Sequence, residues 1–296
     1  MPVDHVIRFQ SARDRARGAP RTAFVLSGGA SLGAVQAGML RALYERGITP
    51  DMLVATSAGG LNAAFVASRP QTVETAKELA DVWLRLRRED VFPVHMPTIF
   101  GALTKRGDHF VPCKPLRRVA GTHLGIARLE DAAIPLHLVA FDLLGGSEVR
   151  LSRGPAVDAV LASAAIPGVL PPVPWGDWLL VDGGVVNNTP ISHAVELGAE
   201  RVFVLPTSDP DERGLTAWPR RPLDAAVQAC KVLVGARLKA DLIRYAAEAE
   251  LIVLRAPNRV GVQPSDFDQA ELLIADGLRA ARRQLDGLDR RTATAA

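Results

Sequence analysis

The sequence has few cysteines and no secretory signal. Its two cysteines among 296 residues, Cys113 and Cys230, show neither the spacing of metal ligands nor a disulfide framework. Such cysteine usage is typical of a protein from a reducing compartment. The first twenty residues are polar and arginine-rich, and they lack the apolar core of a signal peptide. We therefore expect a cytoplasmic protein with no bound metal and no disulfide.

A long, uniformly apolar segment is also missing. Thr22–Leu40 carries no charged residue, but it contains four glycines, and Ser27, Ser31 and Gln36 lie in its middle. A membrane-spanning helix of about 20 residues is more uniformly apolar than this stretch. The sequence therefore predicts no transmembrane segment, and it leaves peripheral contact with a membrane open.

Neither sign of charge dominates the chain. It has 35 Lys and Arg against 32 Asp and Glu, a formal net charge of +3, which is too small to indicate a nucleic-acid partner. With 48% apolar and 23% charged residues, the composition is that of a soluble globular protein.

No repeat, low-complexity block or linker-like stretch divides the sequence. We predict one domain over residues 21–286, with an arginine-rich flexible tail at 1–20 and a second flexible tail at 287–296. The arginines of the first tail fit either a solvated segment or a basic anchor for anionic membranes. The oligomeric state stays open.

Strands and helices alternate along the first part of the chain. We predict a strand at 22–26, a glycine turn, a helix at 34–45, a strand at 52–55, and helices at 61–67 and 73–88. This order is typical of a parallel sheet with helices on both faces. Further strands are expected at 135–144, 148–151, 178–181, 202–205 and 251–254, and helices at 156–164, 191–197, 223–248 and 268–285.

Residues 90–114 interrupt this alternation with three prolines among apolar and polar residues. Two readings fit the segment: an irregular surface excursion, or a lid or lipid-facing loop.

Three glycine-flanked sites carry candidate chemistry, and the first is "LSGGASLGAVQAG". A glycine turn between a strand and a helix leaves backbone N–H groups unpaired, where the helix dipole favours negative charge. That geometry suits a phosphate or an oxyanion equally well. The stretch matches neither the dinucleotide fingerprint nor the Walker loop, and a turn that needs glycine only for its dihedral angles also fits.

The second site is "VATSAGGLNAA", in which Ser57 stands between a predicted strand and a predicted helix. The serine could be a helix N-cap. It could also be a nucleophile on a strained turn of the G-x-S-x-G type, where small residues are needed two positions before and after the serine. Here those positions hold Ala55 and Gly59, so one methyl group is added to the pattern.

The third site is "LLVDGGVVNNTP", where Asp182 ends a predicted strand before two glycines. A serine nucleophile needs a base within hydrogen-bond reach, usually histidine. None of the six histidines lies in a suitable turn, and we expect core or surface roles for His5, His95, His109, His123, His137 and His193. Asp182 is therefore the best candidate for the base.

Taken in this order, these motifs resemble the patatin-like phospholipase family. "VLSGGASLGAVQAGMLRAL" resembles its glycine-rich oxyanion block, and "ATSAGGLNAA" resembles its nucleophile elbow. "ASAAIPGVLPPV" followed by "LVDGGVVNNTPI" resembles its proline-rich and catalytic-aspartate blocks, and "VAFDLLGGSEVRL" is similar to its strand that ends in an aspartate before an acyl-site loop. The resemblance covers residues 22–205 and weakens toward residue 285.

The resemblance implies a three-layer α/β fold of the patatin type, in which helices flank a mostly parallel central sheet. It also implies a serine acyl hydrolase in which Ser57 is the nucleophile and Asp182 the base, with an acyl-enzyme intermediate and no metal or organic cofactor. The oxyanion hole would be formed by the backbone N–H groups of Gly28, Gly29 and Ala30. Four small residues would support the elbow and the dyad loop: Ala55, Gly59, Gly183 and Gly184. The substrate would be a phospholipid, a lysophospholipid or a neutral acyl ester.

Two positions of the glycine block depart from the family pattern. Ala30 and Leu32 stand where a third glycine and a basic residue are usual. Loss of that positive charge favours neutral acyl esters or thioesters over anionic phospholipids. A catalytically weak protein that binds lipids or partners is the alternative reading. A nucleotide-binding protein is a third, but the acidic residue expected at the end of the second strand is missing.

Overall fold

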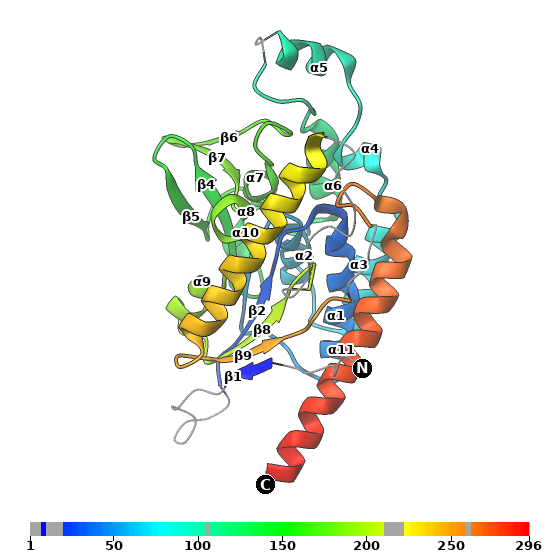
Figure 1. Ribbon diagram of the computed structural model, residues 1–296, viewed down its shortest axis with the longest axis vertical. Helices are drawn as coiled ribbons and strands as arrows, with labels where there is room; N and C mark the ends of the chain where they lie inside the picture. The colour runs from blue at the N-terminus through cyan, green and yellow to red at the C-terminus, as the bar shows by residue number, and fades with distance from the viewer. Residues whose placement is uncertain (1–6, 10–19, 105–106, 210–221, 258–261, 296) are drawn as a thin grey trace.

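The protein is built around one mixed sheet (Figure 1). The computed structural model describes residues 7–9, 20–104, 107–209, 222–257 and 262–295. The strands are β1 (Ile7–Phe9), β2 (Thr22–Leu26), β3 (Met52–Thr56), β4 (Leu136–Asp142), β5 (Ser147–Leu151), β6 (Val173–Trp175), β7 (Trp178–Asp182), β8 (Arg201–Leu205) and β9 (Glu250–Val253). They follow the order β1-β9-β8-β2-β3-β4-β7-β6, and β5 also pairs with β4.

The centre of the sheet is parallel and its outer strands are antiparallel. β2 pairs in parallel with β3 and β8, β3 with β4, and β8 with β9. The pairs that involve β1, β5, β6 and β7 are antiparallel. β2, β3 and β9 are buried at every position, as expected of strands covered on both faces. The predicted α/β class with a mostly parallel central sheet is confirmed.

Helices cover both faces of the sheet (Figure 1). They are α1 (Ala34–Tyr44), α2 (Ala58–Ala67), α3 (Val73–Arg85), α4 (Arg88–Val91), α5 (Met96–Leu103), α6 (Lys114–His123), α7 (Ala156–Ala164), α8 (Gly184–Asn187), α9 (Ile191–Glu196), α10 (Pro222–Tyr245) and α11 (Ala270–Ala295), with short 3-10 turns at Ala30–Gly33, Leu129–Asp131 and Phe267–Gln269.

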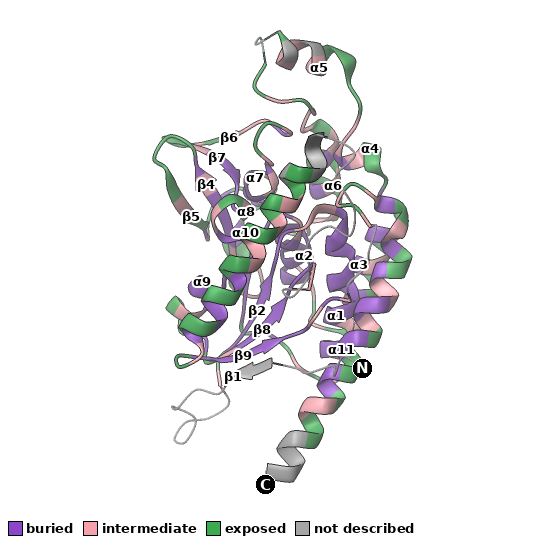
Figure 2. Ribbon diagram, viewed as in Figure 1, coloured by how far each residue is buried: buried purple, intermediate pink, exposed green. Residues whose placement is uncertain are grey.

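The alternation of side chains along each strand divides the core into two hydrophobic clusters. Phe24 and Phe203 point to the face covered by α1, α2, α3 and α11. Val25 and Val204 point to the opposite face, where α9 and α10 pack. Figure 2 shows that the central strands and α1 are buried, whereas α10 exposes much of its outer surface.

The structure differs from the sequence prediction at both ends of the chain. Residues 7–9 pair with β9 as β1, inside the predicted tail at 1–20, and the rest of that tail before residue 20 lies outside the described residues. At the other end α11 continues to Ala295, where the sequence predicted a flexible tail from residue 287. Leu288 packs against the core and Asp289 forms an ion pair with Arg46. No proline or glycine after Gly287 interrupts the helix.

Residues 90–114, for which two readings were open, contain α5, which projects from the top of the molecule in Figure 1. The segment returns to the core where the Val111 N–H donates to the Val169 carbonyl at 2.8 Å. Its role as a lid stays a prediction, and residues 105–106 lie outside the described residues. Among the helices of the described ranges, none combines the length and apolar character that a membrane span requires.

Candidate active site

Ser57 occupies a strained turn between β3 and α2. Its backbone angles are φ +56° and ψ −125°, a region that non-glycine residues rarely adopt and that is found mainly at functional sites. The turn is tight, because a Cβ at Gly59 would lie 2.4 Å from the Leu26 carbonyl oxygen. The extra methyl group of Ala55 is fully buried in the core cluster.

The backbone of Ser57 is fixed by its neighbours. Its N–H donates to Ser163 Oγ at 2.9 Å, and the Ser163 hydroxyl donates to the Val139 carbonyl at 2.7 Å. The Ser57 carbonyl accepts from the Gly60 N–H at 2.8 Å. These bonds hold the strained turn in one conformation. The N-cap reading finds no support, because the Ser57 side chain makes no cap hydrogen bond within α2.

Asp182 lies at the end of β7, close enough to Ser57 that the serine hydroxyl lowers the pKa of its carboxyl. Its own N–H donates to the Ala165 carbonyl at 2.9 Å, and the Gly184 N–H donates to its Oδ1 at 2.7 Å. Asp182 is 6% exposed and Ser57 is 7% exposed. The structure therefore brings together two residues that are 125 positions apart in the sequence (182 − 57).

Burial raises the pKa of the Asp182 carboxyl to about 6, and the Ser57 hydroxyl and the Gly184 N–H offset only part of that effect. A carboxyl with this pKa is about nine-tenths ionised at pH 7, and it holds a proton more tightly than an ordinary aspartate. Both properties suit a general base near neutral pH.

The two glycines after Asp182 stand where the chain leaves no room for a side chain. A Cβ at Gly183 would lie 2.4 Å from the Val139 carbonyl oxygen, and one at Gly184 would lie 2.9 Å from Asn188 Oδ1. The dyad loop therefore depends on the close approach of its backbone to β4 and to Asn188.

The glycine turn after β2 packs directly against Ser57. A Cβ at Gly28 would lie 2.9 Å from Ser57 Cβ, and one at Gly29 would lie 2.3 Å from Thr207 Oγ1. The Gly28 carbonyl accepts from Thr207 Oγ1 at 2.6 Å and from Asn188 Nδ2 at 3.2 Å. Ala30, the next residue, has a positive φ of +49°.

The three predicted oxyanion donors differ in their hydrogen bonds. The Gly28 N–H donates to the Asn188 carbonyl at 3.1 Å. Within the described residues, the N–H groups of Gly29 and Ala30 donate to no protein acceptor. Two of the three groups are thus available to a ligand, while the first joins the turn to Asn188.

A buried polar chain behind the glycine turn was missed by the sequence analysis. Gln36 Nε2 donates to the carbonyls of Ser27 at 2.9 Å and Leu205 at 2.8 Å. Its Oε1 accepts from Asn62 Nδ2 at 2.8 Å, and Asn62 Oδ1 accepts from Trp83 Nε1 at 2.8 Å. Gln36 and Asn62 stand alone within apolar helices, which was the signal that could have identified them.

Four of the five histidines that the structure describes form hydrogen bonds with residues other than Ser57. His95 contacts Thr98, His109 contacts Asp108, His137 contacts Ser152 and His193 contacts Glu148. Burial lowers the pKa of His137 to about 4, helped by the charge of Arg150, so this side chain is neutral at pH 7. The Ser57 hydroxyl instead acts on Asp182, where it lowers the pKa of the carboxyl. Within the described ranges, no group of three or more His, Cys, Asp or Glu is arranged to hold a metal ion.

The protein resembles several solved structures in its fold, although their sequences share few identical residues with this chain. The chain aligns with VipD from Legionella pneumophila over 95% of its length and 70% of that chain, with a TM-score of 0.49 and 14% identity. It aligns with human GIVD cytosolic phospholipase A2 over 92% of its length and 60% of that chain, with a TM-score of 0.47 and 12% identity.

Comparison with curated sequences identifies relatives that are longer. The chain is 29% identical to lysophospholipase NTE1 of Mycosarcoma maydis over 66% of its length and 10% of that protein. It is 30% identical to patatin-like phospholipase domain-containing protein 7 of Mus musculus, over 66% of its length and 14% of that protein. An NTE family protein of Mycobacterium tuberculosis is 28% identical, with 73% of this chain and 56% of that protein aligned.

The chain thus spans 56% or less of the length of these relatives. The patatin-like phospholipase family model matches residues 24–195, a range that contains both the glycine turn and the Ser57–Asp182 pair. Since this match covers more than half of the sequence, and the predicted patatin fold is confirmed with it, the chain belongs to the patatin-like phospholipase family.

Proposed function

We propose that this protein is a serine acyl hydrolase that cleaves acyl esters of lipids, in the manner of a phospholipase A, a lysophospholipase or a lipase. The observation that carries the proposal is the strained turn that places Ser57, with φ +56°, beside the buried Asp182 carboxyl, whose pKa the serine hydroxyl lowers. A hydroxyl held against a base on such a turn is the arrangement of an activated nucleophile.

In the first half-reaction, Asp182 accepts the Ser57 proton while Oγ bonds to the carbonyl carbon of the ester. The carbonyl oxygen becomes an oxyanion. When the tetrahedral intermediate collapses, the bond to the leaving alcohol breaks, and Asp182 returns the proton to that alcohol. In the second half-reaction, a water gives its proton to Asp182 and attacks the acyl-enzyme, which releases the fatty acid and restores the Ser57 hydroxyl.

We assign the oxyanion donors to the N–H groups of Gly29 and Ala30. Both are unpaired within the described residues and belong to the turn that packs against Ser57. The Gly28 N–H already donates to the Asn188 carbonyl at 3.1 Å, so it would contribute only if that bond were exchanged. Loss of one such donor typically lowers kcat by about 10²–10³-fold.

Neutral acyl esters are the favoured substrates among lipids. Leu32, at the position where the family usually carries a basic residue, is 9% exposed and packs in the core cluster. It supplies no positive charge to attract a phosphate headgroup. The names of two relatives, lysophospholipase and patatin-like phospholipase, agree with a lipid ester as the reacting group.

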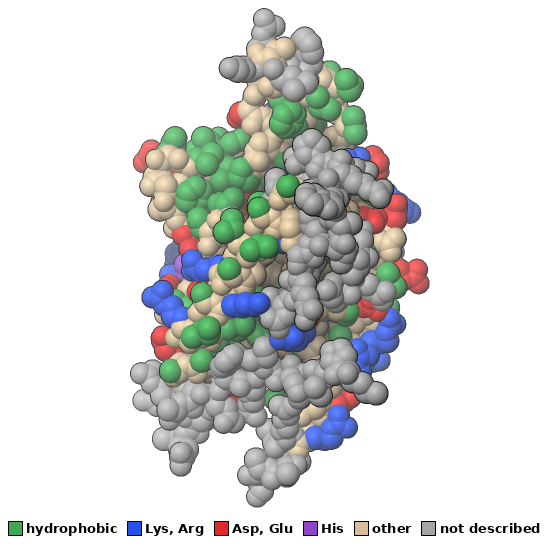
Figure 3. All heavy atoms as spheres, viewed as in Figure 1, with side chains coloured by type: hydrophobic (Ala, Val, Ile, Leu, Met, Phe, Trp, Pro, Cys, Tyr) green, Lys and Arg blue, Asp and Glu red, His purple; other side chains and the backbone are tan. Residues whose placement is uncertain are grey.

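Peripheral contact with a membrane is supported by exposed apolar side chains at both ends of β7. Val185, three residues after Asp182, is 53% exposed, and Leu144 in the β4–β5 turn is 72% exposed. Trp178 at the start of β7 is exposed as well. Figure 3 shows hydrophobic side chains gathered over this part of the molecule. Replacement of Leu144 by Ser is expected to weaken sedimentation with phosphatidylcholine vesicles. The matched variant Ile243→Ser, at an equally exposed site of α10, is expected to leave it unchanged.

Fluorophosphonate labelling of purified protein, together with hydrolysis of a short-chain ester, tests the dyad. We expect wild type to be labelled and active, Ser57→Ala to lose both the label and turnover, and Asp182→Asn to lose turnover. Ser147→Ala, at an exposed serine of β5, is the matched control and keeps both. A folded wild-type protein with neither label nor turnover would instead favour a lipid- or partner-binding protein without catalysis.

A further inference from the structure

Three segments of the candidate active site meet at two consecutive asparagines, Asn187 and Asn188. Thr56, the residue before the nucleophile, donates its hydroxyl to the Asn187 carbonyl at 2.8 Å. The Asn187 N–H donates to the carbonyl of Gly183 at 2.8 Å, in the dyad loop. The Gly28 N–H of the glycine turn donates to the Asn188 carbonyl at 3.1 Å. The backbone at 187–188 therefore connects the nucleophile strand, the dyad loop and the glycine turn.

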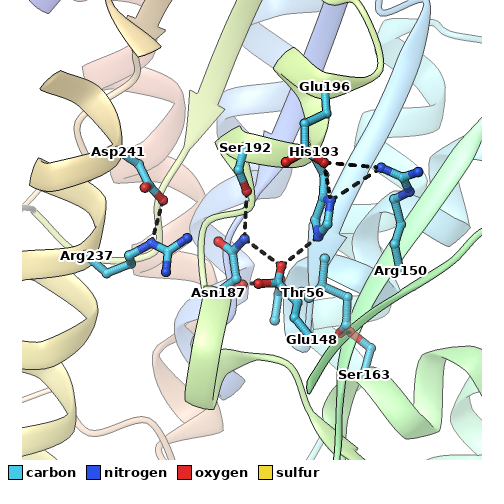
Figure 4. Close-up of polar contacts among 11 residues, drawn as sticks. Thr56, Glu148, Arg150, Ser163, Asn187, Ser192, His193, Glu196, Arg237 and Asp241 are labelled. Atoms are coloured by element: carbon cyan, nitrogen blue, oxygen red, sulfur yellow. Dashed lines mark hydrogen bonds and ion pairs between the residues drawn. The ribbon is translucent and has the colours of Figure 1, made fainter. Parts of the chain in front are cut away.

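The Asn187 side chain makes a second set of contacts, with Glu148 and Ser192. Asn187 is fully buried, and its Nδ2 donates to Glu148 Oε1 at 2.7 Å and to Ser192 Oγ at 3.0 Å. His193 Nε2 lies 2.6 Å from the same Glu148 oxygen. Figure 4 shows Glu148 between Asn187 and His193, with Thr56 beside Asn187. Glu148 belongs to β5 and His193 to α9. These hydrogen bonds therefore connect the Asn187 side chain, at the end of α8, to β5 and α9.

The charge of Glu148 is stabilised at this position. Burial alone would raise the pKa of its carboxyl, but the hydrogen bonds from His193 and Asn187, together with the charges of His193 and Arg237, outweigh burial and lower the pKa. Arg150 and Glu196 contact the far side of the His193 ring. Glu148 is thus a carboxylate at neutral pH, and a carboxylate is a stronger acceptor for the Asn187 amide than a neutral group.

The Asn187 amide is only half satisfied. Its Oδ1 is buried and has no hydrogen-bond partner among the described residues. A buried polar atom without a partner reduces stability, so an apolar residue would serve the fold better at this position. The presence of Asn at position 187 is therefore better explained by the geometry that its amide imposes than by any stability that it supplies.

We propose that Glu148, acting through Asn187, is a positioning residue that sets the distance between Ser57, Asp182 and the glycine turn. The inference rests on the proposed hydrolase function. Glu148 touches no reacting atom. When its carboxylate is removed, the Asn187 side chain loses its charged acceptor and keeps only Ser192 Oγ, so the backbone at 187–188 is held less firmly. Displacements of about 1 Å in a catalytic arrangement can cost about 10²-fold in rate.

The experiment compares kcat and KM for a short-chain ester in wild type, Glu148→Ala and Glu148→Gln. We expect Glu148→Ala to lower kcat by about 10- to 100-fold with a change in KM below about threefold, and to slow fluorophosphonate labelling in parallel. Glu148→Gln should recover most of the activity, because its amide oxygen can still accept from Asn187.

Glu250→Ala is the matched control. Glu250 is also a buried acid in an ion pair, with Arg201 Nε 2.7 Å from its Oε2. Glu250 lies at the amino end of β9, whereas Ser57 follows the carboxyl end of β3, so the two residues are at opposite ends of the parallel strands. We expect Glu250→Ala to lower the thermal unfolding midpoint but to leave kcat at wild-type level. If Glu148→Ala and Glu250→Ala reduce kcat equally for an equal loss of stability, the positioning role is refuted.

If Glu148→Ala does not fold, a second pair of variants tests the proposal by exchanging the carboxylate and the amide between positions 148 and 187. Asn187→Asp is isosteric and places a carboxylate against Glu148, so kcat should fall. The double variant Glu148→Gln with Asn187→Asp rebuilds a donor–acceptor pair with reversed roles, and kcat should recover. Absence of recovery with intact folding would overturn the proposal. Absence of label and turnover in wild type itself would overturn the proposed function and this inference together, whereas an active wild type with kcat unchanged in Glu148→Ala overturns this inference alone.

Discussion

Replacement of Asp182 by Asn is expected to abolish hydrolysis and, at neutral pH, to make the protein more stable. The carboxyl is buried, and its pKa is raised from the ordinary value of 3.8 to about 6. Above pH 6 the folded protein therefore holds a charge in a place that favours the neutral form. Asn is neutral at every pH and can still accept the hydrogen bond from the Gly184 N–H through Oδ1.

The size of the effect follows from the difference between the two pKa values. The pKa is about 6 in the folded protein and 3.8 in the unfolded protein. At 1.36 kcal/mol for each pKa unit, this difference means that folding with an ionised Asp182 costs about 3 kcal/mol. The sign is fixed by proton binding. Between pH 3.8 and pH 6, folded Asp182 keeps its proton while the unfolded side chain has lost it, so stability decreases as the pH rises through this window. Below pH 3.8 the cost is absent, and above pH 6 it is fully present.

Urea unfolding of wild type and Asp182→Asn between pH 3 and pH 8 measures this difference. The stability advantage of the Asn variant should grow by about 3 kcal/mol from the acid end to the neutral end and should level off above pH 7. The other titrating groups are common to both proteins and cancel in the comparison. A stability difference that stays constant with pH would refute the assignment of a buried, pKa-raised carboxyl to Asp182.

Two further predictions follow from the same region. The kcat/KM of wild type should rise with pH and reach half of its maximum near pH 6, because protonated Asp182 cannot accept the Ser57 proton; a profile that is flat from pH 5 to pH 8 would contradict this role. Gly59→Ala should destabilise the protein by about 2 kcal/mol or more in urea unfolding, because its Cβ would lie 2.4 Å from the Leu26 carbonyl oxygen. The control is Gly121→Ala on α6, where nothing lies within 4 Å of the new Cβ. This variant should be neutral or more stable by up to about 1 kcal/mol. An equal loss of stability in both variants would argue against a steric cause.

The sequence predicted the central strands well because their signal is local. β2 and β8 are short apolar runs that are buried on both faces, and such runs can be recognised without knowledge of their partners. The elbow at Ser57 and the loop at Asp182 were found for a related reason, because both need small residues at fixed offsets from a polar one. Local chemistry therefore identified the candidate nucleophile and base.

The sequence did not predict features that depend on pairing over long distances. β6 is three residues long and contains Pro174, which is tolerated at the edge of a sheet but removes the strand signal. The antiparallel pairing of β7 with β4 joins residues about 40 positions apart and is not visible in the residues of β7. Glu148, Asn187 and His193 come from three segments, and no local pattern relates them before the chain is folded.

Ala30 shows how the structure resolves a departure that the sequence alone leaves ambiguous. Among the described residues, Ala30 and Ser57 are the non-glycine positions with positive φ, and both lie in the candidate active site. A left-handed conformation costs a non-glycine residue about 1–2 kcal/mol, which surrounding contacts can offset, such as the Ser31 N–H bond to the Pro264 carbonyl at 3.0 Å. A steric overlap is harder to offset. The chain keeps glycine at Gly28 and Gly29, where a Cβ would come within 2.5 Å and 2.3 Å of its neighbours, and places alanine at the next position of the turn. Among the described residues, the turn therefore leaves the N–H groups of Gly29 and Ala30 unpaired although the third glycine of the family pattern is absent.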